Sequence, residues 1–333
     1  MDDKNDYPSQ YPMGRFRDED VGHTTRLPRS ATNAPWIDIH GHHHTLTWRD
    51  HSEFSRSGCA AVVMTGGLGY ETPYRPVRAA DVRSGWDLVL WHSHSMARSH
   101  FFDVHVAVGV HTSPGPIAGV DELLDVLPTY AALDEVVAIS ETGISMVQEH
   151  ESLPLDEQKR LIADQMAIAH ESDLPMVLHT PSVTKGSTSF RGVSTEAHDH
   201  GELVLERDTA KRDAAEICLE LAAEVGLPER HLVFTHAHPP MSTEVLEKSD
   251  AYLSFTVGDA TRPTTAADVA AAIERHGSER IMIDSDCAGN KQQTPVAIKE
   301  AMLALHRLSV DPAAVDTVAY ENQIEVLNLD VAV

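Results

Sequence analysis

His40 and His42 lie one residue apart at the end of an apolar run, and this spacing is typical of a metal site. In a β-strand, residues two apart point to the same face, so both imidazoles are able to reach one cation. The signal is weak by itself, because 21 histidines in 333 residues produce such pairs by chance. We expect His43 and His44, which extend the cluster, to be loop or supporting residues rather than ligands.

Four further short apolar runs each end in a possible metal ligand: Glu141, His179, His236 and the pair Asp284 and Asp286. Runs of this length with polar residues at their ends predict buried parallel strands. The side chains following such strands would supply imidazole nitrogen and carboxylate oxygen. This mixture suits Zn²⁺, Mn²⁺, Fe²⁺ or Co²⁺ better than Ca²⁺.

The strands that must position these residues alternate with helical patterns from Trp36 onward. The predicted strands cover residues 36–40, 60–65, 103–110, 136–140, 175–179, 231–235, 251–256 and 280–284. Predicted helices cover residues 156–170, 209–225 and 295–308, and another begins near Thr264 to Asp268. Eight strand and helix units predict a (β/α)8 TIM barrel, an α/β fold whose active sites lie at the carboxyl ends of the strands.

The order of the motifs from Trp36 to Leu329 resembles that of TatD-like metal-dependent hydrolases in the amidohydrolase superfamily. The first His-x-His of that family matches His40-Gly41-His42. Its Gly-x-His is similar to Gly109-Val110-His111, and its Glu-x-Gly motif is similar to Glu141-Thr142-Gly143. The resemblance implies a hydrolase of the TIM-barrel type.

The later motifs resemble the family less literally. Its histidines on strands five and six map to His179 and His236, and its Glu-Thr-Asp maps to Asp284-Ser285-Asp286. The segment His179-Thr180-Pro181 with Lys185 is similar to an archaeal-type subgroup. Because His238 follows His236 closely, His238 remains an alternative to His236 as a ligand. In the same way, Asp284 remains an alternative to Asp286.

The resemblance implies a binuclear metal centre. Its ligands would be His40, His42, Glu141, His179, His236 and Asp286. We expect two divalent ions per chain, with zinc first and manganese, iron, cobalt or magnesium as alternatives, and Glu141 bridging them. The ions would lower the pKa of water, and Asp286 would orient or deprotonate that water.

Other residues near the motifs are expected to contact the substrate or to support the ligands. His111, Lys185 and His238 are the candidates for substrate binding. Asp38 and Asp284 each lie two residues before a ligand and are expected to support an imidazole or a carboxylate. Lys185 belongs to a long polar segment, residues 182–208, which is either a functional lid or a variable insertion.

Three functions are compatible with these motifs. The first is a hydrolase that uses metal-activated water on a small phosphoester, ester or amide. The second is a metal-dependent DNase or RNase, with nucleic acid as substrate. The third is a metal-binding scaffold without catalysis. The ligands do not decide among scissile bonds, because the same metals activate water against carbon and phosphorus.

Composition limits the classes of protein. The net charge is -25, with 51 acidic and 26 basic residues, and only seven of the basic residues are lysine. Such an acidic, lysine-poor surface is typical of proteins from salt-accumulating halophiles and argues against a dedicated nucleic-acid binder. The three cysteines are too few and too scattered for a disulfide framework or a cysteine-based zinc site.

We expect residues 1–34 to be a flexible polar tail and residues 35–333 to form a single barrel domain. The acidic N-terminus does not resemble a signal peptide, and no apolar stretch is long enough for a membrane span. The sequence therefore predicts a cytoplasmic protein without a membrane partner, and it leaves the oligomeric state open.

Overall fold

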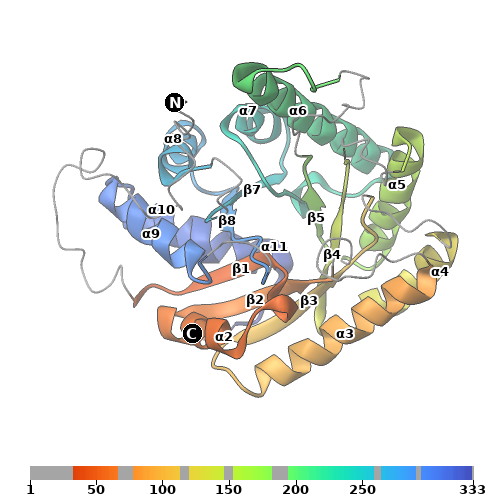
Figure 1. The fold of residues 1–333 in the computed structure, drawn as a ribbon, viewed down its shortest axis with the longest axis horizontal. Coiled ribbons are helices and arrows are strands. Elements are labelled where there is room, and N and C mark those ends of the chain that lie inside the picture. Colours follow the sequence, from red (N-terminus) through yellow and green to blue (C-terminus); the bar gives the residue numbers. More distant parts are fainter. Residues whose placement is uncertain are drawn as a thin grey trace.

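Eight parallel strands alternate with helices along the chain, and each strand pairs with the next one (Figure 1). The computed structural model describes residues 33–66, 78–112, 120–145, 153–181, 194–258, 264–289 and 294–331. The strands are β1 (Trp36–Gly41), β2 (Cys59–Thr65), β3 (Asp103–Val108), β4 (Val136–Gly143), β5 (Met176–His179), β6 (Leu232–Phe234), β7 (Tyr252–Thr256) and β8 (Ile281–Asp284). All eight predicted strands are present, and the predicted (β/α)8 barrel is confirmed.

The helices lie outside the strands, as Figure 1 shows for α3, α4, α5 and α6. They are α2 (Trp48–Ser57), α3 (Ala79–Ala97), α4 (Val120–Ala131), α5 (Leu155–Glu171), α6 (His200–Val225), α7 (Pro239–Lys248), α8 (Ala266–His276), α9 (Ala297–Arg307), α10 (Pro312–Asp316) and α11 (Asn322–Leu327). Short helical turns η2 (His43–Thr45), η3 (Glu229–His231) and η4 (Thr317–Glu321) complete the described elements. None of the described helices combines the length and apolarity that a membrane span requires.

The helix α6 begins nine residues before its predicted start at Thr209. Asp199 caps it: the Asp199 side chain accepts a hydrogen bond from Glu202 N, and the Glu202 side chain accepts one from Asp199 N. This reciprocal capping box satisfies two backbone donors at the start of the helix. The prediction of a loop through residue 208 was therefore wrong, and Lys185 lies outside the described residues.

Two apolar clusters hold the barrel together. The larger one joins the strands to the surrounding helices. The smaller one joins residues from strands on opposite sides of the barrel, such as Ile39, Val177 and Met282, and therefore fills the interior. Leu327 and Leu329 near the C-terminus pack against this interior cluster and close it at one end.

The barrel has a seam between β1 and β8, where no strand ladder joins these two described strands. Single hydrogen bonds connect the ends of the strands instead. Asp286 N donates to His40 O over 2.8 Å, and His42 N donates to Cys287 O over 2.8 Å. The Asp38 carboxylate adds a contact by accepting from Ser285 N at 3.1 Å. The residues around the seam thus include several of the candidate site residues.

Gln165 of α5 connects the ends of β3 and β4 through Val110 and Thr142, which are neighbours in sequence of His111 and Glu141. Its side chain accepts from Val110 N at 2.8 Å and donates to Val110 O at 3.1 Å and Thr142 Oγ1 at 3.0 Å. Gln165 is completely buried, so water cannot replace these partners.

Gln165→Leu should lower the free energy of unfolding by at least about 2 kcal/mol. The substitution leaves the backbone groups of Val110 without their hydrogen-bond partner, and each buried polar group that loses its partner costs about 1 to 3 kcal/mol. Urea denaturation followed by circular dichroism measures this loss. Glu157→Gln, on an exposed position of the same helix, serves as the control and should change the free energy by less than about 0.5 kcal/mol. Equal stability of Gln165→Leu and the wild type would contradict the view that Gln165 stabilises the fold by connecting β3 to β4.

Candidate metal centre

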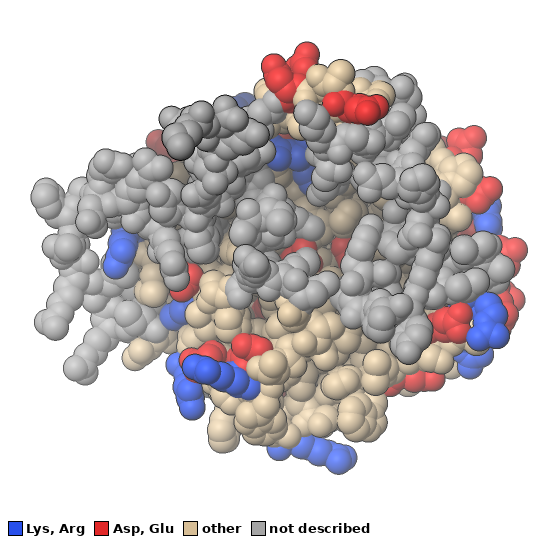
Figure 2. Space-filling model, viewed as in Figure 1, with Lys and Arg blue, Asp and Glu red and all other residues tan. Residues whose placement is uncertain are grey.

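The Glu141 carboxylate lies at the centre of a group of imidazoles. Its Oε1 atom lies 2.8 Å from His179 Nδ1, 3.4 Å from His236 Nε2 and 3.6 Å from His40 Nε2. His111 Nε2 is 4.0 Å from the same oxygen, and His42 Nε2 is 3.8 Å from Oε2. Figure 2 shows acidic atoms near the centre of this face of the molecule.

Asp286 is the second carboxylate of the group. Its Oδ1 atom is 3.3 Å from His42 Nε2 and 3.7 Å from His40 Nε2, and its Oδ2 atom is 3.9 Å from His236 Nδ1. The imidazoles of His40 and His236 therefore lie between the two carboxylates. The structure brings together all six residues that the sequence predicted as ligands, and His111 joins them.

The strand ends position these side chains. Glu141 lies within β4 and His179 is the last residue of β5, whereas His236 and Asp286 each follow their strand by two residues. His236 and Asp286 both have positive φ, 57° and 45°. Residues other than glycine rarely adopt this conformation, and it is concentrated at functional sites. His42 also lies just beyond β1, so the alternation of side chains along a strand does not by itself explain how His40 and His42 converge.

Three sets of ligand atoms in this group have the proximity that one metal ion needs. They are His40, His42 and Asp286; His40, Glu141 and His236; and His111, Glu141 and His179. Within each set the atoms lie within 4.8 Å of one another. Glu141 belongs to two of the sets, and Asp284 and His238 belong to none of them.

Burial and the neighbouring imidazoles shift the pKa of Glu141 in opposite directions. Burial alone would raise the pKa of its carboxyl, but the imidazoles of His40, His179 and His111 together hold this pKa well below its usual range. Glu141 is thus held as a carboxylate, the form that binds a cation.

Asp284 belongs to none of these ligand sets, but it supports one candidate ligand through a hydroxyl group. Its carboxylate accepts hydrogen bonds from Ser254 Oγ and, over 2.9 Å, from Thr256 Oγ1. Thr256 Oγ1 also lies 2.8 Å from His236 Nδ1, so this hydroxyl connects Asp284 to a candidate ligand. Burial, with a smaller contribution from Asp38 and Asp286, raises the pKa of Asp284 to about 7, although the two hydroxyls oppose this shift.

Asp38 contacts an imidazole, but it is that of His43. Asp38 Oδ2 lies 3.0 Å from His43 Nε2, and its Oδ1 accepts from the backbone N–H groups of His40 at 3.3 Å and Ser285 at 3.1 Å. The Ser285 hydroxyl also donates to Asp38. Asp38 therefore fixes the backbone on both sides of the seam and the ring of His43.

His238 follows the predicted ligand His236 by two residues, and its side chain contacts α6. Its Nδ1 atom is 3.5 Å from Asp208 Oδ1, which is also 3.7 Å from Arg207 Nε. Burial, together with Lys211 and Arg207, lowers the pKa of His238 to about 4, although Asp208 opposes this shift. His238 is thus a neutral imidazole near neutral pH.

Lys211 is a buried supporting residue that the sequence patterns had not singled out. It is only 1% exposed, and its Nζ donates to Thr180 Oγ1 over 2.9 Å. Thr180 in turn donates to Thr235 O over 2.7 Å, which joins the ends of β5 and β6. Lys211 lies four residues before Ala215 and seven before Cys218 on the apolar face of α6, and a lysine on such a face is a signal that the sequence offers.

Thr256→Val should weaken metal binding by about 10- to 100-fold, because the hydroxyl that holds the His236 ring would be lost. Isothermal titration of the metal-free protein with Zn²⁺ measures this affinity. Thr256→Ser retains the hydroxyl and should bind nearly as tightly as the wild type. Wild-type affinity in Thr256→Val would show that the hydroxyl does not position His236.

Known proteins are similar to this chain in sequence or in fold. An uncharacterized metal-dependent hydrolase of Methanocaldococcus jannaschii is 22% identical over 286 residues, covering 86% of this chain and 97% of that protein. A TatD-like protein from Archaeoglobus fulgidus has a similar fold, with a TM-score of 0.57 and 19% identity over 88% of this chain and 100% of the other. A phosphotriesterase homology protein from Escherichia coli, solved with phosphate in its active site, gives a TM-score of 0.58 and 14% identity, covering 89% of this chain and 99% of the other.

The family model for TatD-related DNases matches residues 37–328, which is most of the chain and includes every candidate ligand. The resemblance inferred from the order of the motifs is confirmed at the level of the family. Membership and the named relatives together indicate a metal-dependent hydrolase. This chain belongs to the TatD-related DNase family.

Proposed function

We propose that the chain hydrolyses its substrate with water activated at a binuclear metal centre. The observation that carries the proposal is the convergence of two buried carboxylates and five imidazoles at the carboxyl ends of the strands. A carboxylate that bridges two cations must belong to the ligand sets of both, and Glu141 belongs to two of the sets. His40, His42, Glu141, His179, His236 and Asp286 are the proposed ligands.

The donor chemistry fits divalent transition metals. Neutral imidazole nitrogen and carboxylate oxygen are ligands for zinc, which we propose first, and also for manganese, iron or cobalt; magnesium prefers oxygen. Glu141 is 7% exposed and Asp286 is 2% exposed, so their charges are removed from bulk water. Bound dications would compensate the cost of burying these two carboxylates.

The cations would act as Lewis acids and lower the pKa of water. Asp286 is the proposed proton acceptor for that water, because its Oδ1 atom lies beside two of the proposed ligands, 3.3 Å from His42 Nε2 and 3.7 Å from His40 Nε2. Glu141 would hold the neighbouring imidazoles in place through its own contacts. The neutral His238 and the partly exposed His111 are proposed to contact the substrate, as is Lys185.

The substrate class is a small phosphoester, ester or amide. The E. coli relative is named for phosphotriesterase homology and was solved with phosphate in its active site, which favours phosphoesters for this chain. Cleavage of DNA or RNA is the second candidate, and the description of the family as TatD-related DNases favours it. The net charge of -25 opposes tight binding of a long nucleic acid. A scaffold without catalysis is the least favoured alternative.

Glu141→Gln and Asp286→Asn should each reduce the metal content, and Asp286→Asn should lower the hydrolysis rate by about 10²- to 10⁴-fold through loss of the proton acceptor. Elemental analysis gives the metal content of protein purified without chelator. Chromogenic phosphodiester, ester and amide substrates and a short single-stranded DNA give the rates.

Asp134→Asn is the matched control, since it removes one exposed carboxylate just before β4, at the strand end away from Glu141. It should retain full metal content and activity. The proposal fails if both site variants keep wild-type metal content and wild-type rates on a substrate that the wild type hydrolyses.

We also propose that the protein works in the cytoplasm of a salt-accumulating cell and belongs to an archaeal-type subgroup of the family. The net charge of -25 and the seven lysines support the first part, and the His179-Thr180-Pro181 segment supports the second. Repulsion among the carboxylates destabilises the folded state at low salt.

Raising KCl from about 0.1 M to about 1 M shortens the Debye length from about 10 Å to about 3 Å and should raise the melting temperature. Differential scanning calorimetry measures this change. Chloride is preferable to sulfate, because sulfate stabilises proteins by exclusion from the surface regardless of charge. A melting temperature that stays constant or falls with KCl would contradict the halophilic assignment.

A further inference from the structure

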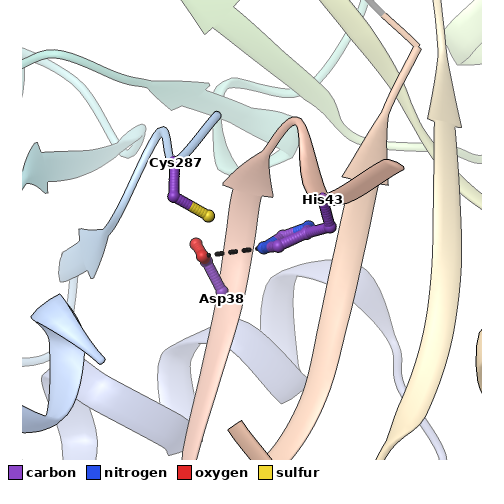
Figure 3. A group of neighbouring side chains, drawn as sticks. All are labelled: Asp38, His43 and Cys287. Carbon is purple, nitrogen blue, oxygen red and sulfur yellow. Dashed lines mark hydrogen bonds and ion pairs between the residues drawn. The ribbon is translucent and has the colours of Figure 1, made fainter. Parts of the chain in front are cut away.

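A second group of ligand-type side chains lies at the seam of the barrel. It consists of Asp38 of β1, His43 of η2 and Cys287, which follows β8, and Figure 3 shows the carboxylate, the imidazole and the thiol turned toward one another. Each side chain contributes one ligand atom, and these three atoms lie within 4.8 Å of one another. Asp38 and His43 have 0% exposure and Cys287 has 1%. None of the three belongs to the sets that contain Glu141 or Asp286.

The local backbone is arranged to bring these atoms together. A Cβ atom at Gly41 would lie 2.6 Å from two atoms of the His43 ring, so only glycine lets the ring fold back over the end of β1. The main chain of Cys287 is fixed on both sides: its N–H donates to Ser285 Oγ over 3.1 Å, and its carbonyl accepts from His42 N over 2.8 Å. The ligand atoms are therefore held by strand ends on both sides of the seam.

We propose that Asp38, His43 and Cys287 form a separate site for a thiophilic divalent cation such as Zn²⁺. Zinc accepts sulfur, nitrogen and oxygen ligands in one tetrahedral site. The Ser285 hydroxyl donates a hydrogen bond to Asp38 and would orient this carboxylate toward the cation. The cation would connect β1 to the segment after β8, where no strand ladder closes the barrel.

The charges balance when the cation binds. The Cys287 thiol releases its proton to solvent and binds as thiolate, Asp38 binds through Oδ2, and neutral His43 binds through the lone pair of Nε2 with its one proton on Nδ1. The contact of 3.0 Å between His43 Nε2 and Asp38 Oδ2 is then replaced by one bond from each atom to the cation. One carboxylate, one thiolate and one dication give a neutral group, which reduces the cost of burying charge.

Cobalt substitution tests this site independently of catalysis. The proposed catalytic ligands contain only nitrogen and oxygen, so a thiolate-to-cobalt charge-transfer band in the near ultraviolet can come only from a cysteine ligand. The full chain is stripped with chelator and reloaded with Co²⁺. We expect the band in the wild type and in Cys218→Ser, which removes another buried thiol on α6.

Cys287→Ser should abolish the band and lower the cobalt content by about one ion per chain, and His43→Gln should lower the cobalt content similarly. The proposal is overturned if the folded wild type takes up cobalt without the band, which needs no variant to fold. A band that persists in Cys287→Ser also overturns it. The proposed site does not depend on the proposed function, so the two can fail separately. A protein that shows the band but hydrolyses no substrate would contradict only the proposed function. A protein that hydrolyses a substrate but shows no band would contradict only the site of Asp38, His43 and Cys287.

Discussion

The contact between the Glu141 carboxylate and the surrounding imidazoles is the interaction on which the site depends. Five histidines from four different strand ends lie within 4.0 Å of this one carboxylate. A charge so deeply buried is costly unless cationic or hydrogen-bonding groups surround it. The positions of β1, β3, β5 and β6 around β4 are therefore tied to the chemistry of a single side chain.

Support for this group comes from residues outside it, and each support joins two strands. Thr256 connects Asp284 to His236, Gln165 connects the ends of β3 and β4, and Lys211 acts through Thr180 on β5 and β6. Because these side chains are buried, their hydrogen bonds are not exchanged for water, and they fix the angles of the ligands more firmly than exposed contacts would. Metal-site geometry depends on such supports as well as on the ligands themselves.

The seam between β1 and β8 contrasts with the rest of the barrel. Elsewhere, ladders of backbone hydrogen bonds join neighbouring strands, but here individual contacts through Asp38, Ser285 and the main chain replace a ladder. The candidate ligands His40 and Asp286 lie beside this seam, linked by a hydrogen bond between their main chains. The geometry of the candidate metal centre thus depends on the contacts that join β1 to β8. A cation bound by Asp38, His43 and Cys287, as proposed above, would stabilise these contacts.

The sequence by itself determined the eight strands and the barrel, and it indicated which strand ends contribute candidate ligands, because apolar runs that end in His, Asp or Glu are local patterns. It did not determine which residue of a close pair enters the group. Tertiary structure decided that Asp286 and His236 point into it, since both adopt positive φ just beyond their strands, whereas Asp284 turns to Ser254 and Thr256. It also decided that Asp38 holds His43 and that Lys211 reaches Thr180 across 31 positions of sequence. These outcomes depend on which neighbours the folded barrel supplies, and side-chain periodicity along one strand or helix contains no information about neighbours on another.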